Sequence, residues 1–73
     1  MSRNLYLISY DISEPAALRK ILKLIKSYAI AGQKSFYECW MTKQELKALQ
    51  SAVIELIDAQ TDSVMIFQLD PRL

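Results

Sequence analysis

Histidine is absent from this sequence of 73 residues, and cysteine and glycine each occur once. The absence of histidine excludes histidine as an acid–base catalyst and as a metal ligand. The lone Cys39 cannot form an internal disulfide or a multi-cysteine zinc site, which fits a reducing compartment. It is more often a small buried hydrophobic residue than a nucleophile, because no histidine can activate it. Any hydrolytic chemistry must rest on carboxylates, a metal ion, tyrosine, lysine or serine.

Long hydrophobic runs are also missing. No apolar stretch approaches the roughly 18 residues that span a bilayer, and no signal peptide is visible, so we expect a cytoplasmic protein without membrane contact. The length predicts a single domain over residues 1–73. Hydrophobic residues nevertheless make up 52% of the chain. A chain this short buries only about 60% of its unfolded surface, so we expect part of its apolar surface in a subunit interface.

The first half of the chain predicts a strand followed by a helix. Residues 5–10 are a short run rich in apolar and aromatic residues, as is typical of a strand. Ser13 is expected to cap the next helix, with Glu14 and Pro15 in its first turn. Within residues 16–28, apolar side chains recur at helical spacing: Leu18, Ile21, Leu22, Ile25 and Tyr28.

The second half predicts further strands and a second helix. Residues 33–41 indicate a strand in which Trp40 and Met41 cover the helix layer, and the space between the helices suffices for two short strands or one long bent strand. Thr42 and Glu45 form a capping-box pattern at the start of the second helix. Its apolar face consists of Leu46, Leu49, Val53, Leu56 and Ile57. A polar turn at 58–62 precedes a last strand at 63–69, "SVMIFQL".

Together these elements predict an α/β (α+β) fold with the order β-α-β-β-α-β. Two helices and short connections favour an antiparallel sheet with both helices on one face, which is the ferredoxin-like sandwich. The other face of the sheet and at least one edge strand then stay uncovered, and both are potential dimerisation surfaces.

Asp11 stands at the end of the first predicted strand, just before the helix. From the local sequence, a turn residue that satisfies backbone amides is about as good an explanation as a functional group. As a functional group, its carboxylate suits Mg²⁺, which prefers one or two carboxylates together with water and phosphate oxygens. In a symmetric dimer, two copies of Asp11 that meet near the two-fold axis would share one metal ion.

Four cations share one side of the first predicted helix: Arg19, Lys20, Lys23 and Lys26. At 100° per residue from Arg19, Lys23 lies at about 40° and Lys26 at about −20°. Lys20 lies farther round, at about 100°. A solvated charged face is the usual explanation for such a pattern. Mixed charges would favour that explanation, and the second helix has them. The first helix carries only positive charges on this face, which suits contact with a phosphate backbone better than a merely solvated surface.

The polar residues Gln33, Lys34 and Ser35 precede an aromatic pair. Exposed aromatic rings can stack on bases, although such residues more often pack in a core or an interface. Tyr10 is in a position to orient a substrate phosphate, although half-buried packing is the commoner role. We predict a nucleic-acid contact for Lys34 and supporting roles for Tyr10, Gln33 and Ser35.

Four blocks of the chain resemble the CRISPR-associated Cas2 family, in that order and at its usual spacing. They are "LYLISYDIS", "LRKILKLIKSY", "GQKSFYECWMT" and "TDSVMIFQL". The resemblance spans nearly the whole chain and implies a ferredoxin-like fold, a symmetric homodimer and a role in acquiring CRISPR spacers. It also implies the Cas1 integrase and a DNA duplex as partners. Members are described as Mg²⁺-dependent endonucleases on RNA or DNA, and the resemblance implies that Asp11 binds the metal across the dimer axis.

Two features depart from the family pattern. A Gly-x-Arg-Val sequence often precedes the Gln-x-Ser block, whereas Ala29, Ala31 and Gly32 stand here, without the arginine expected to contact phosphate or substrate. Family members also usually continue into a further strand that crosses to the partner subunit, and this sequence stops at Leu73. We expect either a short form or a dimer held by the sheet faces alone.

The leading hypothesis is a homodimeric, nucleic-acid-binding protein of CRISPR adaptation, with Asp11 as its catalytic and Mg²⁺-binding residue. Hydrolysis would use a metal-activated water that attacks a phosphodiester in line. A second hypothesis is a stand-alone, toxin-like endoribonuclease that acts on single-stranded RNA. A third is a ferredoxin-like protein-interaction module without catalysis.

Overall fold

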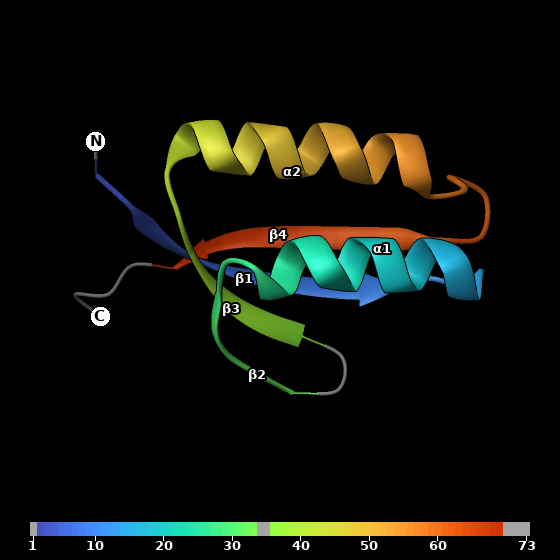
Figure 1. Cartoon of the computed structure of the whole chain (residues 1–73), viewed down its shortest axis with the longest axis horizontal. Coiled ribbons are helices and arrows are strands. Elements are labelled where there is room, and N and C mark those ends of the chain that lie inside the picture. Colours follow the sequence, from blue (N-terminus) through green and yellow to red (C-terminus); the bar gives the residue numbers. More distant parts are fainter. Residues whose placement is uncertain (1, 34–35, 70–73) are drawn as a thin grey trace.

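Four strands of the described residues form one antiparallel sheet, and two helices cover one of its faces (Figure 1). The computed structural model describes residues 2–33 and 36–69. The elements follow the order β1 (Asn4–Asp11), α1 (Pro15–Lys26), β2 (Ala29–Gln33), β3 (Phe36–Met41), α2 (Lys43–Leu56) and β4 (Ser63–Leu69). The predicted ferredoxin-like α/β sandwich is therefore confirmed.

The strand order β2-β3-β1-β4 places β1 inside the sheet. It pairs antiparallel with β3 on one side and with β4 on the other. The segment between the helices forms two short strands rather than one long bent strand, and Gln33 ends β2 instead of starting β3. β2 and β4 each have one neighbour, so both edges of the sheet are uncovered within the described part of the chain.

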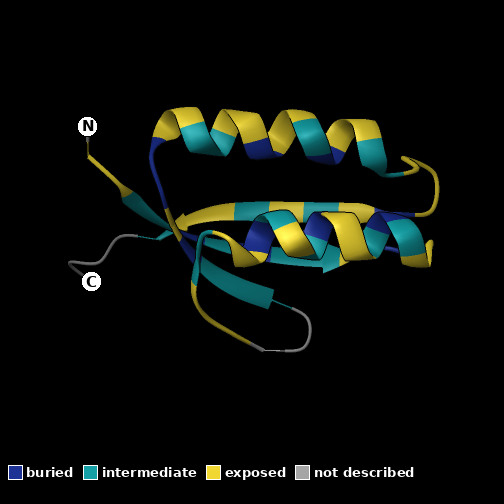
Figure 2. Cartoon of the chain, viewed as in Figure 1, coloured by how far each residue is buried: buried dark blue, intermediate teal, exposed yellow. Residues whose placement is uncertain are grey.

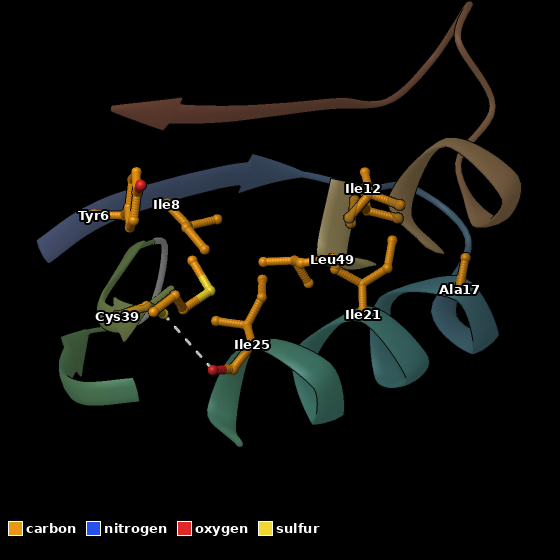
Figure 3. Close-up of a cluster of buried hydrophobic side chains, with 10 residues drawn as sticks. Tyr6, Ile8, Ile12, Ala17, Ile21, Ile25, Cys39 and Leu49 are labelled. Atoms are coloured by element: carbon orange, nitrogen blue, oxygen red, sulfur yellow. Dashed lines mark hydrogen bonds between the residues drawn. The ribbon is translucent and has the colours of Figure 1, made fainter. Parts of the chain in front are cut away.

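The hydrophobic core lies between the sheet and the helices (Figure 3). In α1, Ala17, Ile21 and Ile25 are buried at a spacing of four residues, which places them on one stripe of the helix. Figure 2 shows the same layering for α2, whose buried residues lie on the side toward the sheet and whose exposed residues lie on the outer side. The buried set comprises Tyr6, Ile8, Ile12, Ala17, Ile21, Ile25, Cys39, Met41, Leu49 and Val53. In the described ranges, neither helix has the length and apolar character to cross a membrane.

The start of α1 differs from the prediction. Glu14, not Ser13, is the N-cap residue, and its carboxylate accepts hydrogen bonds from two first-turn backbone N–H groups at 3.0 and 2.6 Å. These hydrogen bonds are the main cause of the lowered pKa of Glu14. Pro15 takes the first helical position, where no N–H is needed. The backbone N–H of Ser13 instead donates to the carboxylate of Asp62, so a tertiary contact fixes Ser13 outside the helix.

The predicted capping box at the start of α2 is confirmed. The Thr42 hydroxyl accepts a hydrogen bond from the N–H of Glu45 at 3.1 Å, and the Glu45 carboxylate accepts one from the N–H of Thr42 at 2.8 Å. The bond from the Thr42 backbone is the largest cause of the lowered pKa of Glu45. Glu45 also forms an ion pair with Arg3, which ties the start of the chain to α2.

The face of the sheet away from the helices, the open face, carries a second apolar set. Alternation along β3 buries Met41 against the helices and turns Trp40, which is 42% exposed, to the open face. The prediction that both residues cover the helix layer is therefore wrong for Trp40. In β4, Met65 and Phe67 are 53% and 50% exposed on the same face. In β1, β3 and β4 the open face consists of Leu5, Leu7, Ser9, Asp11, Phe36, Glu38, Trp40, Ser63, Met65, Phe67 and Leu69.

Cys39 lies inside the core. Its side chain is fully buried, and its thiol donates a hydrogen bond to the carbonyl oxygen of Ile25 at 3.7 Å (Figure 3). Burial raises the pKa of the thiol to about 11. Cys39 therefore acts as a small buried hydrophobic residue, in agreement with the interpretation of the sequence.

Cys39 should resist alkylation in the folded protein. The thiolate is the reactive form, and raising the pKa from 9.0 to about 11 leaves about 100-fold less of it near pH 8. We expect iodoacetamide to label native Cys39 at least about 100-fold more slowly than the urea-unfolded chain, as followed by mass spectrometry. Because the folded-state pKa is raised, the linked contribution to stability is complete below about pH 9 and is lost as the pH rises through about 11. Equal labelling rates in the two states would contradict a buried Cys39.

Candidate functional site

Asp11 is the last residue of β1 and one of the exposed residues of the sheet. It pairs across the sheet with Ser63, the first residue of β4. Strand alternation assigns its side chain to the open face, in the same row as Leu5 and Leu7. Its carboxylate therefore stands at one end of a largely apolar surface.

The donor chemistry at Asp11 fits Mg²⁺. A carboxylate supplies hard oxygen ligands, and Mg²⁺ commonly binds through one or two carboxylates with water and phosphate oxygens completing its shell. Within residues 2–33 and 36–69, no three or more Cys, Asp and Glu side chains of one chain come together as a metal site. Water, substrate phosphate and an Asp11 from a second subunit are the additional ligands that this arrangement leaves room for.

Tyr10 lies on the other side of the sheet from Asp11, since consecutive strand residues face opposite ways. It packs against the core, and its ring stacks on Tyr37 with centroids 6.3 Å apart and 17° between the ring planes. Burial, and after it the neighbouring Tyr37, raises the pKa of Tyr10. Tyr10 thus has the half-buried packing role, while its contact with a substrate phosphate stays a prediction.

The position of Tyr37 depends on Gly32 in β2. A Cβ atom at position 32 would lie 2.1 Å from Cδ1 of Tyr37, so only glycine lets the aromatic ring cover the strand backbone here. The sequence of contacts from Gly32 through Tyr37 to Tyr10 links three strands. It fixes the residue that immediately precedes Asp11.

The four predicted cations are all exposed on α1, as the helical spacing indicated. Leu22 lines a shallow hollow of about 420 Å³ on the surface of α1. Three of the cations also line it: Arg19, Lys23 and Lys26. Lys20 is not part of its lining, in keeping with its position about 100° round the helix from Arg19. The cationic stripe therefore consists of three side chains, with the fourth beside it.

The N-cap residue Glu14 influences the cations nearest to it. After the first-turn N–H groups, the charges of Arg19 and Lys20 also lower the pKa of Glu14, so these two cations are partly compensated. Lys23 and Lys26 lie in the last turn of α1, where the negative end of the helix dipole stabilises positive charge. Glu14 lies at the opposite end of the helix from them.

Asp11 and the cationic stripe lie on different layers of the molecule. α1 covers one face of the sheet (Figure 1). Strand alternation assigns Asp11 to the open face. One chain therefore does not bring these groups into a common pocket. Of the remaining predicted residues, Gln33 is the last residue of β2 and pairs with Phe36 through the backbone. Lys34 and Ser35 lie outside the described residues.

Asp62 is not among the site residues that the sequence predicts, because it falls in a polar turn. Its side chain is 9% exposed and accepts hydrogen bonds from the backbone N–H groups of Ser13 and Asp58, each at 2.9 Å. These bonds, with that from Ser13 first, lower the pKa of Asp62. Nothing in the sequence of the turn indicates a partner 49 residues away.

The sequence of this chain is similar to known CRISPR proteins. The family model described as CRISPR associated protein Cas2 matches residues 4–72. A protein of Nitrosomonas europaea named CRISPR-associated endoribonuclease Cas2 2 is 42% identical over 73 residues, and the match covers 100% of this chain and 65% of that protein. A Thermodesulfovibrio yellowstonii protein named CRISPR-associated endoribonuclease Cas2 1 is 43% identical over 70 residues, covering 96% of this chain and 76% of that one.

Two solved structures share the fold. A hypothetical protein from Thermus thermophilus superposes with a TM-score of 0.85 and 29% identity, over 94% of this chain and 84% of that one. Streptococcus pyogenes Cas2 at pH 6.5 gives a TM-score of 0.80 and 31% identity, over 90% of this chain and 86% of that one. The open-face aspartate and the basic α1 thus occur in a chain that matches one family along almost its entire length: this chain belongs to the CRISPR associated protein Cas2 family.

Proposed function

We propose that this chain is a subunit of a homodimeric, nucleic-acid-binding protein of CRISPR adaptation with Mg²⁺-dependent endonuclease activity. Family membership supports this, as do the endoribonuclease names of the relatives from Nitrosomonas europaea and Thermodesulfovibrio yellowstonii. The observation that carries the catalytic part is Asp11, an exposed carboxylate at the end of an interior strand and on an apolar sheet face.

The open face is the proposed dimer interface. Trp40, Met65 and Phe67 are large apolar side chains that are about half exposed on this face. Apolar side chains gathered on one exposed surface are typical of a protein–protein interface. In a dimer with two-fold symmetry the same surface serves both subunits, so a second copy of the chain covers the open face with the open face of its own.

Dimerisation through the open face puts Asp11 of each subunit on the shared interface. In this proposal the two carboxylates hold one Mg²⁺ ion together with water and phosphate oxygens. The bound ion supplies Lewis-acid stabilisation of phosphodiester charge and a lowered pKa of water. Asp11 itself acts as a metal ligand and as a hydrogen-bond acceptor that orients the attacking water toward phosphorus. No histidine is needed for either task.

The cationic stripe is the proposed contact with the phosphate backbone. At 1.5 Å per residue, Arg19 and Lys26 are about 10 Å apart along α1. That length corresponds to about three phosphate-to-phosphate steps of one strand of B-DNA, each roughly 3.4 Å along the helix axis. Lys23 lies between them, so the stripe provides three cations over these three steps. A dimer presents two such stripes.

Within CRISPR adaptation, we propose that the dimer bridges Cas1 integrase subunits and lies along the incoming DNA duplex. The resemblance to the family supports this partner, and the uncovered edges of β2 and β4 offer backbone groups for contact with another protein. The phosphate contacts of α1 then serve the scaffold role, and Asp11 serves cleavage.

Asp11→Asn should remove Mg²⁺-dependent cleavage. The amide keeps the size of the side chain but loses the charge that binds the metal. We expect kcat on RNA and on duplex DNA to fall by at least about 100-fold, measured with Mg²⁺ and with EDTA. Glu55→Gln, which neutralises an exposed carboxylate on α2, is the matched control and should cleave like the wild type. Unchanged cleavage by Asp11→Asn would show that Asp11 is not the metal ligand.

Reversing two charges of the cationic stripe should weaken nucleic-acid binding. For Lys23→Glu with Lys26→Glu, we expect weaker duplex affinity and a plot of log Kd against log salt that is flatter by about two units. Fluorescence anisotropy between low and moderate salt measures both. The control with the same change in charge is Lys43→Glu with Lys47→Glu on α2. Equal effects of the two double variants would show that net charge, rather than the cationic stripe, governs binding.

A charge on the open face should dissociate the dimer. Phe67→Glu removes apolar burial and places a carboxylate in the interface, so we expect the dimer dissociation constant to rise by at least about 100-fold in sedimentation experiments. Ile54→Glu is the matched control, because Ile54 is 74% exposed but lies on α2, away from the open face. A dimer that survives Phe67→Glu would refute the open face as the interface.

A further inference from the structure

Asp62 is a buried carboxylate beside the proposed site. It immediately precedes Ser63, and Ser63 pairs with Asp11 across the sheet. Its side chain is 9% exposed, and among the described residues it is the one charged side chain in the buried class. Burying a carboxylate costs free energy of desolvation unless several hydrogen-bond donors surround it. The donors around Asp62 therefore show which parts of the chain this carboxylate holds together.

Both oxygens of the Asp62 carboxylate accept hydrogen bonds. Oδ1 accepts from the backbone N–H of Ser13 at 2.9 Å and from the hydroxyl of Thr61 at 3.2 Å. Oδ2 accepts from the backbone N–H of Asp58 at 2.9 Å. Two of these partners belong to the α2–β4 turn, whereas Ser13 belongs to the β1–α1 connection. One side chain therefore joins the two connections at this end of the sheet.

The bond from Ser13 closes a small ring around Asp11. The path runs from Asp11 through Ile12 to Ser13, across the hydrogen bond to Asp62, on to Ser63, and back across the strand pairing to Asp11. Ile12 is itself 9% exposed and belongs to the core. The backbone at Asp11 is consequently held from the β4 side at two points, the pairing with Ser63 and the hydrogen bond of Ser13 to Asp62, although the Asp11 side chain is exposed.

The residue before Asp11 is held by a separate contact. Tyr10 stacks on Tyr37, and the ring of Tyr37 sits against the backbone of Gly32. Asp11 thus lies between an aromatic contact from β3 and a hydrogen-bonded contact from the α2–β4 turn. A metal ligand requires such a fixed backbone, because catalytic groups that are misplaced by about 1 Å lose much of their effect.

We propose that Asp62 is a positioning residue of the Asp11 site, which holds the β1–α1 connection so that the Asp11 carboxylate meets metal and substrate in a fixed orientation. The proposal rests on the proposed nuclease function. Asp62 does not touch the reacting atoms and acts through the backbone of Asp11. Its loss should therefore reduce turnover and leave the binding of nucleic acid at the cationic stripe unchanged.

Asp62→Ala tests this, with Asp58→Ala as the matched control. The Asp58 side chain accepts a hydrogen bond from the N–H of Gln60 at 2.9 Å in the same turn, whereas Ser13 donates to Asp62. The substitution at Asp58 keeps its backbone N–H, which donates to Asp62. We expect Asp62→Ala to lower kcat for Mg²⁺-dependent cleavage by at least about 10-fold, with KM for nucleic acid within about two-fold of wild type. Asp58→Ala should keep both parameters within about two-fold.

A merely structural role for Asp62 predicts a different result. Both variants would then show similar losses, or kcat of Asp62→Ala would stay within about two-fold of wild type at temperatures where the protein is folded. Either outcome overturns the proposal. If Asp62→Ala does not fold, Asp62→Asn replaces it. Its amide oxygen is the one acceptor left for the N–H groups of Ser13 and Asp58, so we expect kcat and the protection of the Ser13 amide to change together: both fall where the bond to Ser13 is lost, and both stay near wild type where it is kept. A change in one of the two without the other overturns the proposal.

Amide hydrogen exchange separates this proposal from the nuclease function. In Asp62→Ala the Ser13 amide should exchange at least about 10-fold faster than in wild type, while in Asp58→Ala it should not. Unchanged exchange at Ser13 would overturn the positioning role whatever the cleavage result. Absence of Asp11-dependent cleavage in the wild type would refute the nuclease function instead, and the exchange measurement would still report whether Asp62 holds the connection.

Discussion

Strand β1 is constrained on both edges and on the face that the helices cover, and the positions of the other functional groups follow from it. It pairs with β3 and β4 along most of its length. One row of its side chains, which includes Tyr6 and Ile8, is sealed beneath the helices. A shift of register by one residue would exchange this row with the row that contains Leu5 and Leu7. The register that buries Ile8 therefore also sends Asp11 to the open face, because residues 8 and 11 have opposite parity.

This constraint separates the two proposed activities. α1 packs over the buried row of β1, so its cationic stripe points away from the sheet, while Asp11 belongs to the face that the proposed dimer closes. A nucleic acid held along Lys23 and Lys26 reaches Asp11 only by passing around an edge of the sheet or by using the α1 of another subunit. The proposed binding and the proposed cleavage are therefore separable, and the proposed scaffold function would not require an active Asp11.

Much of this structure follows from local patterns in the sequence. The capping box of Thr42 and Glu45 is formed as predicted because both groups lie within one helical turn. The last strand, β4, likewise spans residues 63–69 as predicted. One wrong prediction involves a tertiary choice: Ser13 and Glu14 are both possible caps, and the hydrogen bond from Ser13 to Asp62 holds Ser13 outside the helix. The other overlooks a local rule, because the consecutive strand residues Trp40 and Met41 face opposite sides of the sheet. The role of Asp62 could not be predicted from the sequence, because no local pattern indicates a hydrogen bond between residues that are 49 positions apart.

The open face connects stability with the proposed metal site. A chain of 73 residues has a small core, and burying Trp40 and Phe67 in a dimer adds apolar contact that one chain does not provide for itself. Two acids, Asp11 and Glu38, are the charged members of this face in the described strands, so association also brings like charges together and removes water from them. In the proposed dimer, a cation held between two Asp11 carboxylates would offset this repulsion. Such an ion would bind the dimer better than the separate subunits, so by mass action the metal would strengthen the dimer and dimerisation would strengthen metal binding to the same extent.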